Sequence, residues 1–437
     1  MASGDDAARV VITGVGVVSP IGIGHESFWA SLAAGRGGIA ELSAPSPAPL
    51  PLPLRLAAEI TDFDPLDYLP SRKLLKVMSR DIQLGVAASR LAIDDAGLAR
   101  GELDPERVGV SFGAGRISSL PEDLAAATGF VDPQAETSAD DAIDWTRWGE
   151  DSLGRIAPMW LLRRLPNMSA CHVSIGLDAR GPNNTITSRD TSALLALAEG
   201  VRVIERGAAD CMVVGASGSL LQPIDLVKLS LSRTLSQHVD DPATACRPFD
   251  AQRDGTVLGE GAAALVIERL ETARARGATV HGEVIGCGAG CDGQVAGEGL
   301  VNAIAAALGD AGIEPGELGH VNAGATGSPE EDSIEARAIE IALGDSARSV
   351  PVTALAGYLG HSDAGGGALE LAGCLLSAAH RLAPFTRGFR SAEDGCRLDI
   401  VAQAPVELSS HLGLSCNRTE FGQSAAVVVR AESPILS

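Results

Sequence analysis

The segment that decides the fold is CRPFDAQRDGTVLGEGAAALVIERLETARARGA, residues 246–278. Its apolar run, AAALVIERL (262–270), is short, is rich in aliphatic residues and follows glycines, which predicts a buried strand. Three polar motifs stand in front of that run, namely RPFD (247–250), RDG (253–255) and GEGA (259–262). Because these motifs occur together and in a fixed order, we use the block as the anchor for the rest of the chain.

Strand and helix candidates alternate on both sides of this block. Apolar residues at helical spacing predict helices over 79–97 and 191–207. Short apolar or β-branched runs predict strands over 9–20, 107–115, 183–187, 210–218, 280–290, 318–327 and 424–432. The order repeats with little residue similarity, which is weak evidence for a duplication. We therefore expect an N-terminal half, 1–270, and a C-terminal half, 271–437, with an acidic insertion at about 131–152.

Composition and charge reduce the number of function classes that suit this chain. The 437 residues are 45% hydrophobic and 21% charged, which is typical of a globular protein. Only 3% are aromatic while 51 are glycine, so we expect a layered α/β core in which backbones approach closely. With 34 basic and 56 acidic side chains, the net charge is 34 − 56 = −22. Such a chain repels phosphate backbones and anionic lipid, so nucleic-acid and membrane-surface roles are disfavoured.

The N-terminal residues and the cysteines indicate a reducing compartment. The first residues, MASGDDAARVVITG, are acidic where a signal peptide is basic, and no apolar stretch reaches the roughly 18 residues of a membrane span. The eight cysteines form no CxxC pair and lack zinc-ligand spacing with histidine, so we expect free thiols, a cytoplasmic protein and neither metal nor cofactor. Cys287 and Cys291, in GCGAGCDG, are interpreted as packing residues.

Five segments, in order, resemble the β-ketoacyl-acyl-carrier-protein synthases. They are RVVITGVGVVSPIG, LPNMSACHVSIGLDARGPNNTIT, the block at 246–278, VNAGATGSPEEDSIEARAI and LGHSDAGGGALELAG, and the resemblance covers about residues 9–431. It implies the thiolase-like α/β fold, with five αβαβα layers and two pseudo-repeated halves. It also implies a dimer whose interface includes the strand before the nucleophile.

The catalytic residues of that family are mostly replaced here. Condensing members place a cysteine nucleophile in Thr-Ala-Cys-Thr-Ser, and the matching stretch, Ser188–Ser192, has Asp190 at that position. The first family histidine, in Asn-Ala-His-Gly-Thr, corresponds to Gly324, whereas the second, in Gly-His, is kept as His361. The family lysine five residues upstream corresponds to Ala356. We therefore expect no catalytic residue at Asp190, Gly324 or His361.

The glycine-rich loop of the family is also changed. Gly-Phe-Gly-Gly-Thr-Asn corresponds to Glu420–Ala425, so the gating phenylalanine survives as Phe421. Glu420 and Gln423 replace two of the three glycines, which makes positive φ angles more costly.

Several of these residues also have a purely structural interpretation. Asp190 precedes a helix and would be a good N-cap, worth about 1 kcal/mol over alanine. His361 could be a core hydrogen-bonding residue, and Asp332 and Glu335 are expected to hold loops. Cys171 and His172 are neighbours in sequence, but adjacent side chains on one element point apart, so we expect no catalytic dyad from them.

Loss of the nucleophile, one histidine and the lysine on a preserved scaffold matches one branch of the family. It resembles the chain length factor, the ketosynthase β subunit of type II polyketide synthases, which pairs with an active ketosynthase α subunit. Aromatic-polyketide members carry glutamine where this chain has Asp190, so a reduced or polyene product is at least equally compatible. Acyl carrier proteins are acidic, so we expect the carrier to dock mainly on the partner.

Two other functions stay open from the sequence. The chain could be an enzyme that uses Asp190 and His361 for decarboxylation, transfer or hydrolysis of an acyl thioester. It could also be a ligand-binding or scaffolding homodimer.

Bulky side chains gather where the family's growing chain would extend. Three of the four tryptophans lie in 113–168, and we expect Phe130, Met159 and Trp160, together with Phe421, to bound or gate a cavity. Trp145 and Trp148 could instead anchor the insertion.

Overall fold

The computed structural model describes residues 9–43, 54–117, 150, 155–156 and 159–432. Within these ranges most strands belong to one mixed sheet, whose main path has a defined order of hydrogen-bonded neighbours, while β12 (Leu382–Ala383) and β14 (Val406–Glu407) form a separate two-stranded sheet. That order is β13 (Asp399–Ile400), β11 (Pro351–Ala354), β10 (His320–Ala323), β15 (Leu412–Arg418), β16 (Gln423–Ala431), β9 (Gly282–Cys291), β1 (Val10–Ser19), β8 (Leu258–Arg269), β7 (Cys211–Ser219), β5 (Val108–Ala114) and β6 (Asn183–Ile186).

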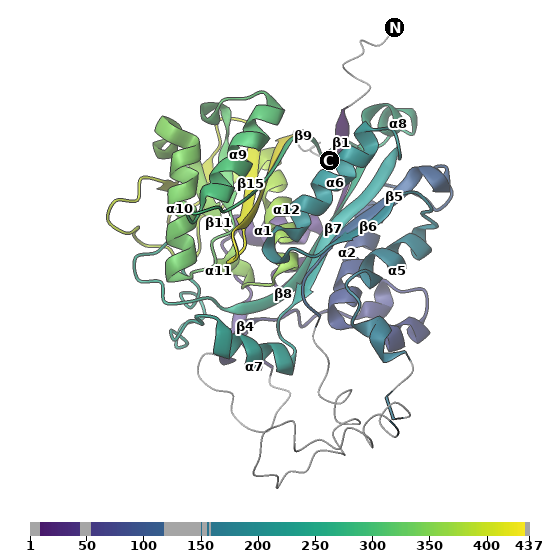
Figure 1. Cartoon of the computed structure of the whole chain (residues 1–437), viewed down its shortest axis with the longest axis horizontal. Coiled ribbons are helices and arrows are strands. Elements are labelled where there is room, and N and C mark those ends of the chain that lie inside the picture. The colour runs from purple at the N-terminus through teal and green to yellow at the C-terminus, as the bar shows by residue number, and fades with distance from the viewer. Residues whose placement is uncertain (1–8, 44–53, 118–149, 151–154, 157–158, 433–437) are drawn as a thin grey trace.

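Most helices cover the outer faces of this sheet, and others lie between its two halves (Figure 1). The helices are α1 (His25–Ala33), α2 (Arg80–Asp95), α5 (Met168–Leu177), α6 (Ser192–Glu205), α7 (Pro223–Ser232), α8 (Leu270–Ala275), α9 (Glu298–Ala311), α10 (Pro329–Leu343), α11 (Ala356–Leu359) and α12 (Ala364–His380). All the predicted strands are present, at 9–20, 107–115, 183–187, 210–218, 262–270, 280–290, 318–327 and 424–432. The helices predicted at 79–97 and 191–207 are α2 and α6.

The same pattern of strand pairing occurs twice. β1 pairs antiparallel with β8 and β8 with β7, after which β7, β5 and β6 run parallel. β9 likewise pairs antiparallel with β16 and β16 with β15, after which β15, β10 and β11 run parallel. Where the two sets meet, β1 pairs with β9 only at Val10, Val11 and Ile12. The division of the chain at about residue 270 stays a prediction.

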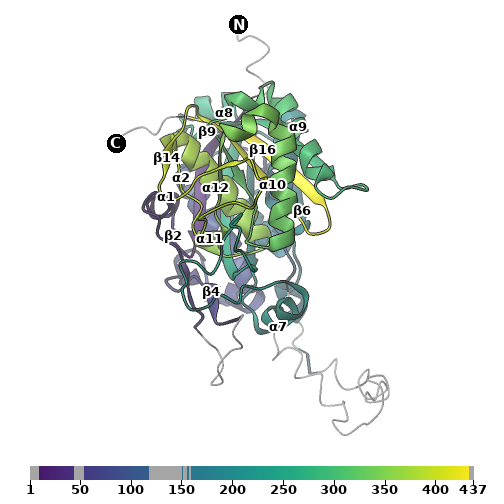
Figure 2. The same ribbon diagram turned by 90° about the vertical axis from the view of Figure 1, so that its left-hand side faces the viewer.

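Helices α6 and α12 lie between the two sets of strands, so five layers result. One buried apolar cluster joins these two helices to β1, β7, β8 and β16. A second cluster lies under α9 and α10, and a third under α2 and α5. Figures 1 and 2 show α9 and α10 covering one outer face, whereas α2 and α5 cover the other in Figure 1. The expected αβαβα thiolase-like fold is therefore confirmed.

Glycines in the two central strands let these layers approach closely. A Cβ on Gly16 of β1 would lie 1.9 Å from the carbonyl oxygen of Ala88 in α2. A Cβ on Gly288 of β9 would lie 2.0 Å from the carbonyl oxygen of Ala303 in α9. Both helices are thus in backbone contact with their strands, as the composition predicted. No helix among the described residues has both the length and the apolar character needed to cross a bilayer.

Candidate functional site

Asp190 lies in the turn that joins β6 to α6. The turn is held by hydroxyl groups, because the backbone N–H of Ser188 donates to Ser192 Oγ at 2.8 Å and Thr191 Oγ1 donates to the Ser188 carbonyl at 2.8 Å. Arg189 adopts a left-handed φ of 51°, which is uncommon for a residue with a side chain. This backbone places the Asp190 side chain inside the molecule, 16% exposed.

The N-cap interpretation of Asp190 is wrong. Thr191 occupies the N-cap position of α6, and no side-chain hydrogen bond caps that helix. The short 3-10 turn from Arg189 to Thr191 moves the helix start one residue further along the chain. The carboxylate of Asp190 instead faces His361, with Oδ1 3.4 Å from Nε2.

His361 lies between α11 and α12 and is held by backbone bonds to β8. Its N–H donates to the Val257 carbonyl at 2.7 Å, and its carbonyl accepts from the Gly259 N–H at 2.8 Å. Burial, assisted by the nearby Arg233, lowers the pKa of His361 to about 3. Burial also raises the pKa of Asp190 despite the guanidinium groups of Arg233 and Arg189. At neutral pH the imidazole of His361 is therefore uncharged.

Gly324, where the family has a histidine, lies just beyond β10 against α10. Its N–H donates to Glu335 Oε1 at 2.8 Å. A Cβ added at Gly324 would lie 2.6 Å from Asn417 Nδ2, and Asn417 in turn donates to Glu370 Oε2. The position therefore lacks an imidazole, and a side chain there would require Asn417 to move.

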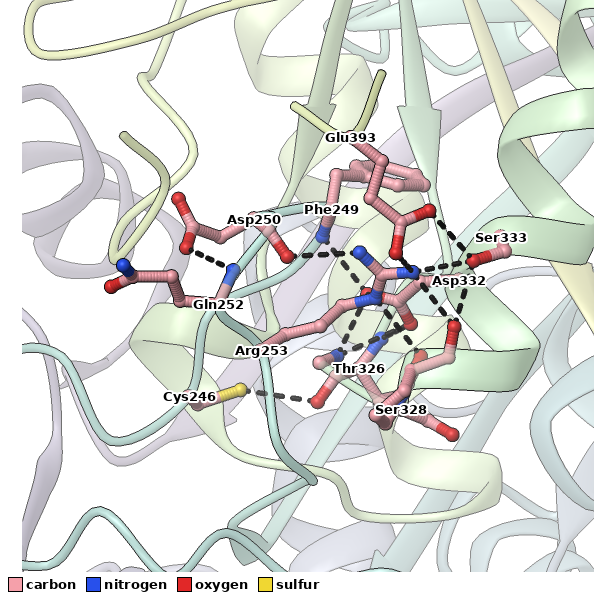
Figure 3. A network of polar contacts seen from close by, with 12 residues as sticks. Cys246, Phe249, Asp250, Gln252, Arg253, Thr326, Ser328, Asp332, Ser333 and Glu393 are labelled. Atoms are coloured by element: carbon pink, nitrogen blue, oxygen red, sulfur yellow. Dashed lines mark hydrogen bonds and ion pairs between the residues drawn. The ribbon is translucent and has the colours of Figure 1, made fainter. Parts of the chain in front are cut away.

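The anchor block 246–278 holds the loop that follows Gly324 (Figure 3). Asp332 accepts hydrogen bonds from the backbone N–H groups of Phe249, Thr326 and Gly327, at 2.9–3.2 Å. Arg253 donates to the carbonyl of Pro329 at 2.7 Å. Asp332 and Glu335 therefore hold loops, as predicted, and the RPFD and RDG motifs position this side of the site.

A cluster of charged residues lies at the mouth of the site. The guanidinium of Arg189 contacts Glu420 Oε1 at 2.7 Å and approaches Asp363 Oδ1 to 3.4 Å. Arg233, at the end of α7, forms a close ion pair with the same Glu420. The ring of Phe421 is 65% exposed and lies 5.6 Å from the Arg189 guanidinium. The two arginines and Glu420 thus fill the space beside the site, whereas Phe421 faces outward.

The cavity that remains is small. Its volume is about 30 Å³, which is room for one or two water molecules rather than an acyl chain. Asp190, His361, Gly324 and Glu335 contribute to its lining. Ala356, which stands where the family has a lysine, is buried at the start of α11. A carboxylate and a neutral imidazole can share a proton or bind an ion, but they provide no thiolate to carry an acyl group.

The residues expected to bound a product cavity do not meet at this site. Met159 is 54% exposed, and Trp160 begins the 3-10 turn η8 (Trp160–Arg163) that precedes α5. Neither residue contributes to the lining of the cavity beside Asp190. The insertion at 131–152, except residue 150, and the side chains Phe130, Trp145 and Trp148 lie outside the described residues.

The predicted packing role is confirmed for Cys287, which is buried, but it is wrong for Cys291, which is exposed at the end of β9. Cys171 and His172 lie on α5, away from the cavity lining. Cys287 and Cys291 lie on β9 and are free thiols. Sequence reasoning missed Arg189, Arg233 and Asp363, and the arginine next to the substituted nucleophile position was the one available signal.

Comparison with known proteins gives the relationship of the chain. The family described as "Beta-ketoacyl synthase, N-terminal domain" matches residues 7–273, and "Beta-ketoacyl synthase, C-terminal domain" matches residues 281–390. The tetracenomycin polyketide synthase ketoacyl synthase alpha subunit of Streptomyces glaucescens is 35% identical over 432 residues, which cover 97% of each chain. The 3-oxoacyl-[acyl-carrier-protein] synthase 2 of Coxiella burnetii is 33% identical over 432 residues, covering 96% of this chain and 98% of that protein.

Solved structures agree with these matches. A chain of the ishigamide ketosynthase/chain length factor superposes with a TM-score of 0.82 at 29% identity, covering 98% of this chain and 100% of the other. A β-ketoacyl synthase from Burkholderia phymatum gives a TM-score of 0.83 at 28% identity, with 97% and 99% coverage.

Proposed function

Because this chain belongs to the β-ketoacyl synthase family, we propose that it is the non-condensing subunit, the chain length factor, of a type II polyketide ketosynthase heterodimer. The single observation that carries the proposal is the pair Asp190 and Gly324 at the family's nucleophile and first histidine positions. The scaffold around them is preserved, from the anchor block to the helix that follows the nucleophile turn.

The chemistry of condensation explains why these two residues matter. The family reaction needs a thiolate to hold the acyl group and two imidazoles to assist decarboxylation and stabilise the enolate oxygen. A carboxylate is a poor nucleophile toward a thioester, and glycine donates no side-chain hydrogen bond. The charged cluster of Arg189, Arg233 and Glu420 further reduces the space in which a thioester could bind.

The edge of the sheet supports a partner role. β6 is the last strand on its side and pairs with β5 alone among the described strands. Helix α5 lies beside it and presents Ile175, which is 70% exposed. An unpaired strand edge next to an exposed apolar side chain suits a second subunit. Under this proposal the partner that binds at this edge is an active ketosynthase α subunit, and Met159 and Trp160 lie near the shared cavity.

Co-expression tests the proposal. The chain, tagged, is produced with each ketosynthase encoded beside it, and the captured complex is analysed for stoichiometry and mass. We expect a 1:1 heterodimer with a ketosynthase that has an intact Cys/His/His set, with an interface of about 2,000 Å² or more. A chain that stays monomeric and ignores every co-encoded ketosynthase would refute the proposal.

One observation favours a second candidate. Asp190 and His361 approach to 3.4 Å, a distance compatible with acid–base chemistry on a thioester. Turnover of acyl thioesters by the isolated chain, abolished in Asp190→Asn, would select this enzyme over the subunit.

A further inference from the structure

We infer that Asp190, His361 and Asp363 bind a divalent first-row transition metal ion, for which Zn²⁺ is the best fit. One oxygen from each carboxylate and one imidazole nitrogen lie within 4.8 Å of one another. Two donors on a tetrahedral zinc ion, with bonds of about 2.0–2.1 Å, lie about 3.3 Å apart. The 3.4 Å between Asp190 Oδ1 and His361 Nε2 matches that spacing, and the oxygen of Asp363 lies within 4.8 Å of both atoms.

Two of the three ligand atoms lack a hydrogen bond. His361 and Asp363 are only 4% and 2% exposed, and neither His361 Nε2 nor Asp363 Oδ1 forms a hydrogen bond. Their charged neighbours, Asp190 Oδ1 and Arg189 Nε respectively, lie 3.4 Å away. Buried polar atoms are normally satisfied by protein, water or an ion, because an unmade bond costs about 1–3 kcal/mol. Both residues belong to the group of three whose ligand atoms lie within 4.8 Å of one another. A metal ion would satisfy them together.

The backbone fixes the orientation of these ligands. Asp363 has a left-handed φ of 54°, and its Oδ2 accepts from the Arg116 N–H at 3.3 Å, which leaves Oδ1 for another partner. His361 is held at both its N–H and its carbonyl by β8. One imidazole and two carboxylates are a ligand set suited to zinc or manganese.

The adjoining cavity carries an excess of acid. Five carboxyl groups line it, from Asp190, Glu331, Asp332, Glu335 and Glu420, against the guanidinium groups of Arg233 and Arg418. Burial raises the pKa of Asp332 to about 6 and raises that of Glu335 well above its usual value. The volume of about 30 Å³ suits an ion with a bound water. A bound cation would offset this excess of acidic groups.

Arg189 is the competitor for this position. Its guanidinium approaches Asp363 Oδ1 to 3.4 Å, but it is held more closely by Glu420 at 2.7 Å. A bound ion would displace Arg189 from Asp363 and leave it paired with Glu420. Removing the arginine charge should therefore strengthen metal binding, which an accidental surface site would not do.

Cobalt titration of the full chain, freed of metal by a chelator, tests the site. Co²⁺ is followed by its visible absorption, Zn²⁺ by competition, and the bound metal by elemental analysis. We expect one Co²⁺ per chain in a tetrahedral environment, displaced by Zn²⁺. Binding should weaken by more than about tenfold in Asp190→Asn and in Asp363→Asn, since loss of even an outer-shell partner costs that much.

Two further variants make the result decisive. Asp94→Asn alters a carboxylate of α2 that is 53% exposed, and it should leave binding unchanged. Arg189→Asn removes the competing charge while tolerating the left-handed φ, and it should tighten binding. Absence of binding by the natural chain, equal binding by Asp190→Asn, weaker binding by Arg189→Asn, or a thiolate-to-cobalt band would each overturn the inference. Circular dichroism checks that every variant is folded. None of these readouts involves the proposed ketosynthase partner, so the two proposals fail independently.

Discussion

At the scale of the single residue, substitution of Gly324 tests whether this position has room for a side chain. A Cβ at this position would lie 2.6 Å from Asn417 Nδ2, which is tied to Glu370. Gly324→Ala should therefore destabilise the fold by about 1–3 kcal/mol, because Asn417 must move. Gly309 in α9 is the matched control, since its Cβ would meet nothing within 4 Å, and Gly309→Ala should stabilise by about 0.5–1 kcal/mol. Denaturant unfolding measures both, and equal effects would show that Gly324 has room for a side chain.

The buried side chain of His320 allows a prediction of how the unfolding free energy depends on pH. Both of its ring nitrogens are buried without a hydrogen bond, and burial lowers its pKa to about 4. The unfolded chain, with a histidine pKa of about 6.5, binds this proton first as the pH falls. The stability that His320 contributes is therefore present above about pH 6.5 and is lost toward pH 4, by on the order of 3 kcal/mol. His320→Gln should flatten the decline in unfolding free energy over that range, whereas His238→Gln, at an exposed position, should not. If the His320→Gln variant showed the same pH dependence of the unfolding free energy as the natural chain, the decline would come from other titratable groups.

The same scale separates what the sequence could predict at the site from what it could not. Asp190, Gly324 and His361 were predictable because each stands in a local motif with fixed neighbours. Asp363 and Arg233 were not, because their roles depend on contacts between segments far apart in the sequence, including a left-handed backbone at Asp363. The N-cap error at Asp190 has a similar cause. A 3-10 turn, rather than an α-helix, begins at Arg189.

At the scale of the element, the positions of the strands along the chain could be predicted from the sequence, but their order in the sheet could not. Apolar runs located β1, β7 and β8 within a few residues, because burial on both faces requires continuous apolar sequence. Strand order depends on non-local pairing, so the place of β6 at the sheet edge came only from the structure. That edge adjoins Ile175 on α5.

The α5 surface gives a prediction about pairing. Ile175→Arg should change the unfolding free energy of the isolated chain by less than about 0.5 kcal/mol, because the side chain is 70% exposed. In the heterodimer the added charge would be buried, so Kd should rise more than about tenfold. Ile341→Arg on α10, where the side chain is 57% exposed on the opposite outer face, is the control and should leave Kd unchanged. Equal Kd values for both variants would place the partner elsewhere.

The turn η8 gives a prediction about products. Trp160→Ala in the reconstituted complex should shift products toward longer chains, because a void of side-chain size can hold extra carbons, each worth about 0.8 kcal/mol when buried. Condensation itself should persist, because no catalytic group is removed. Trp29→Ala, which removes the ring stacked on His380, should leave the product length unchanged. An unaltered product distribution from a folded, paired Trp160→Ala variant would show that this residue does not bound the cavity.

At the scale of the whole molecule, a five-layer scaffold surrounds a site in which Asp190 and Gly324 stand at the positions expected for the family's cysteine and first histidine. The two sets of strands, the central helices α6 and α12 and the outer helices form continuous buried clusters, so nothing in the described fold is degraded. The net charge of −22 disfavours recruitment of an acidic carrier protein by this chain. A preserved fold with a replaced nucleophile is what a structural partner of an active ketosynthase requires.

Intact-protein mass spectrometry of the complex tests this account most directly. The chain and its ketosynthase partner are incubated with acyl and malonyl carrier proteins, and the mass of each subunit is followed over time. The account predicts an acyl adduct on the partner alone, with this chain at its unmodified mass, because Asp190 cannot carry a stable acyl thioester. A stoichiometric acyl adduct on this chain would contradict it.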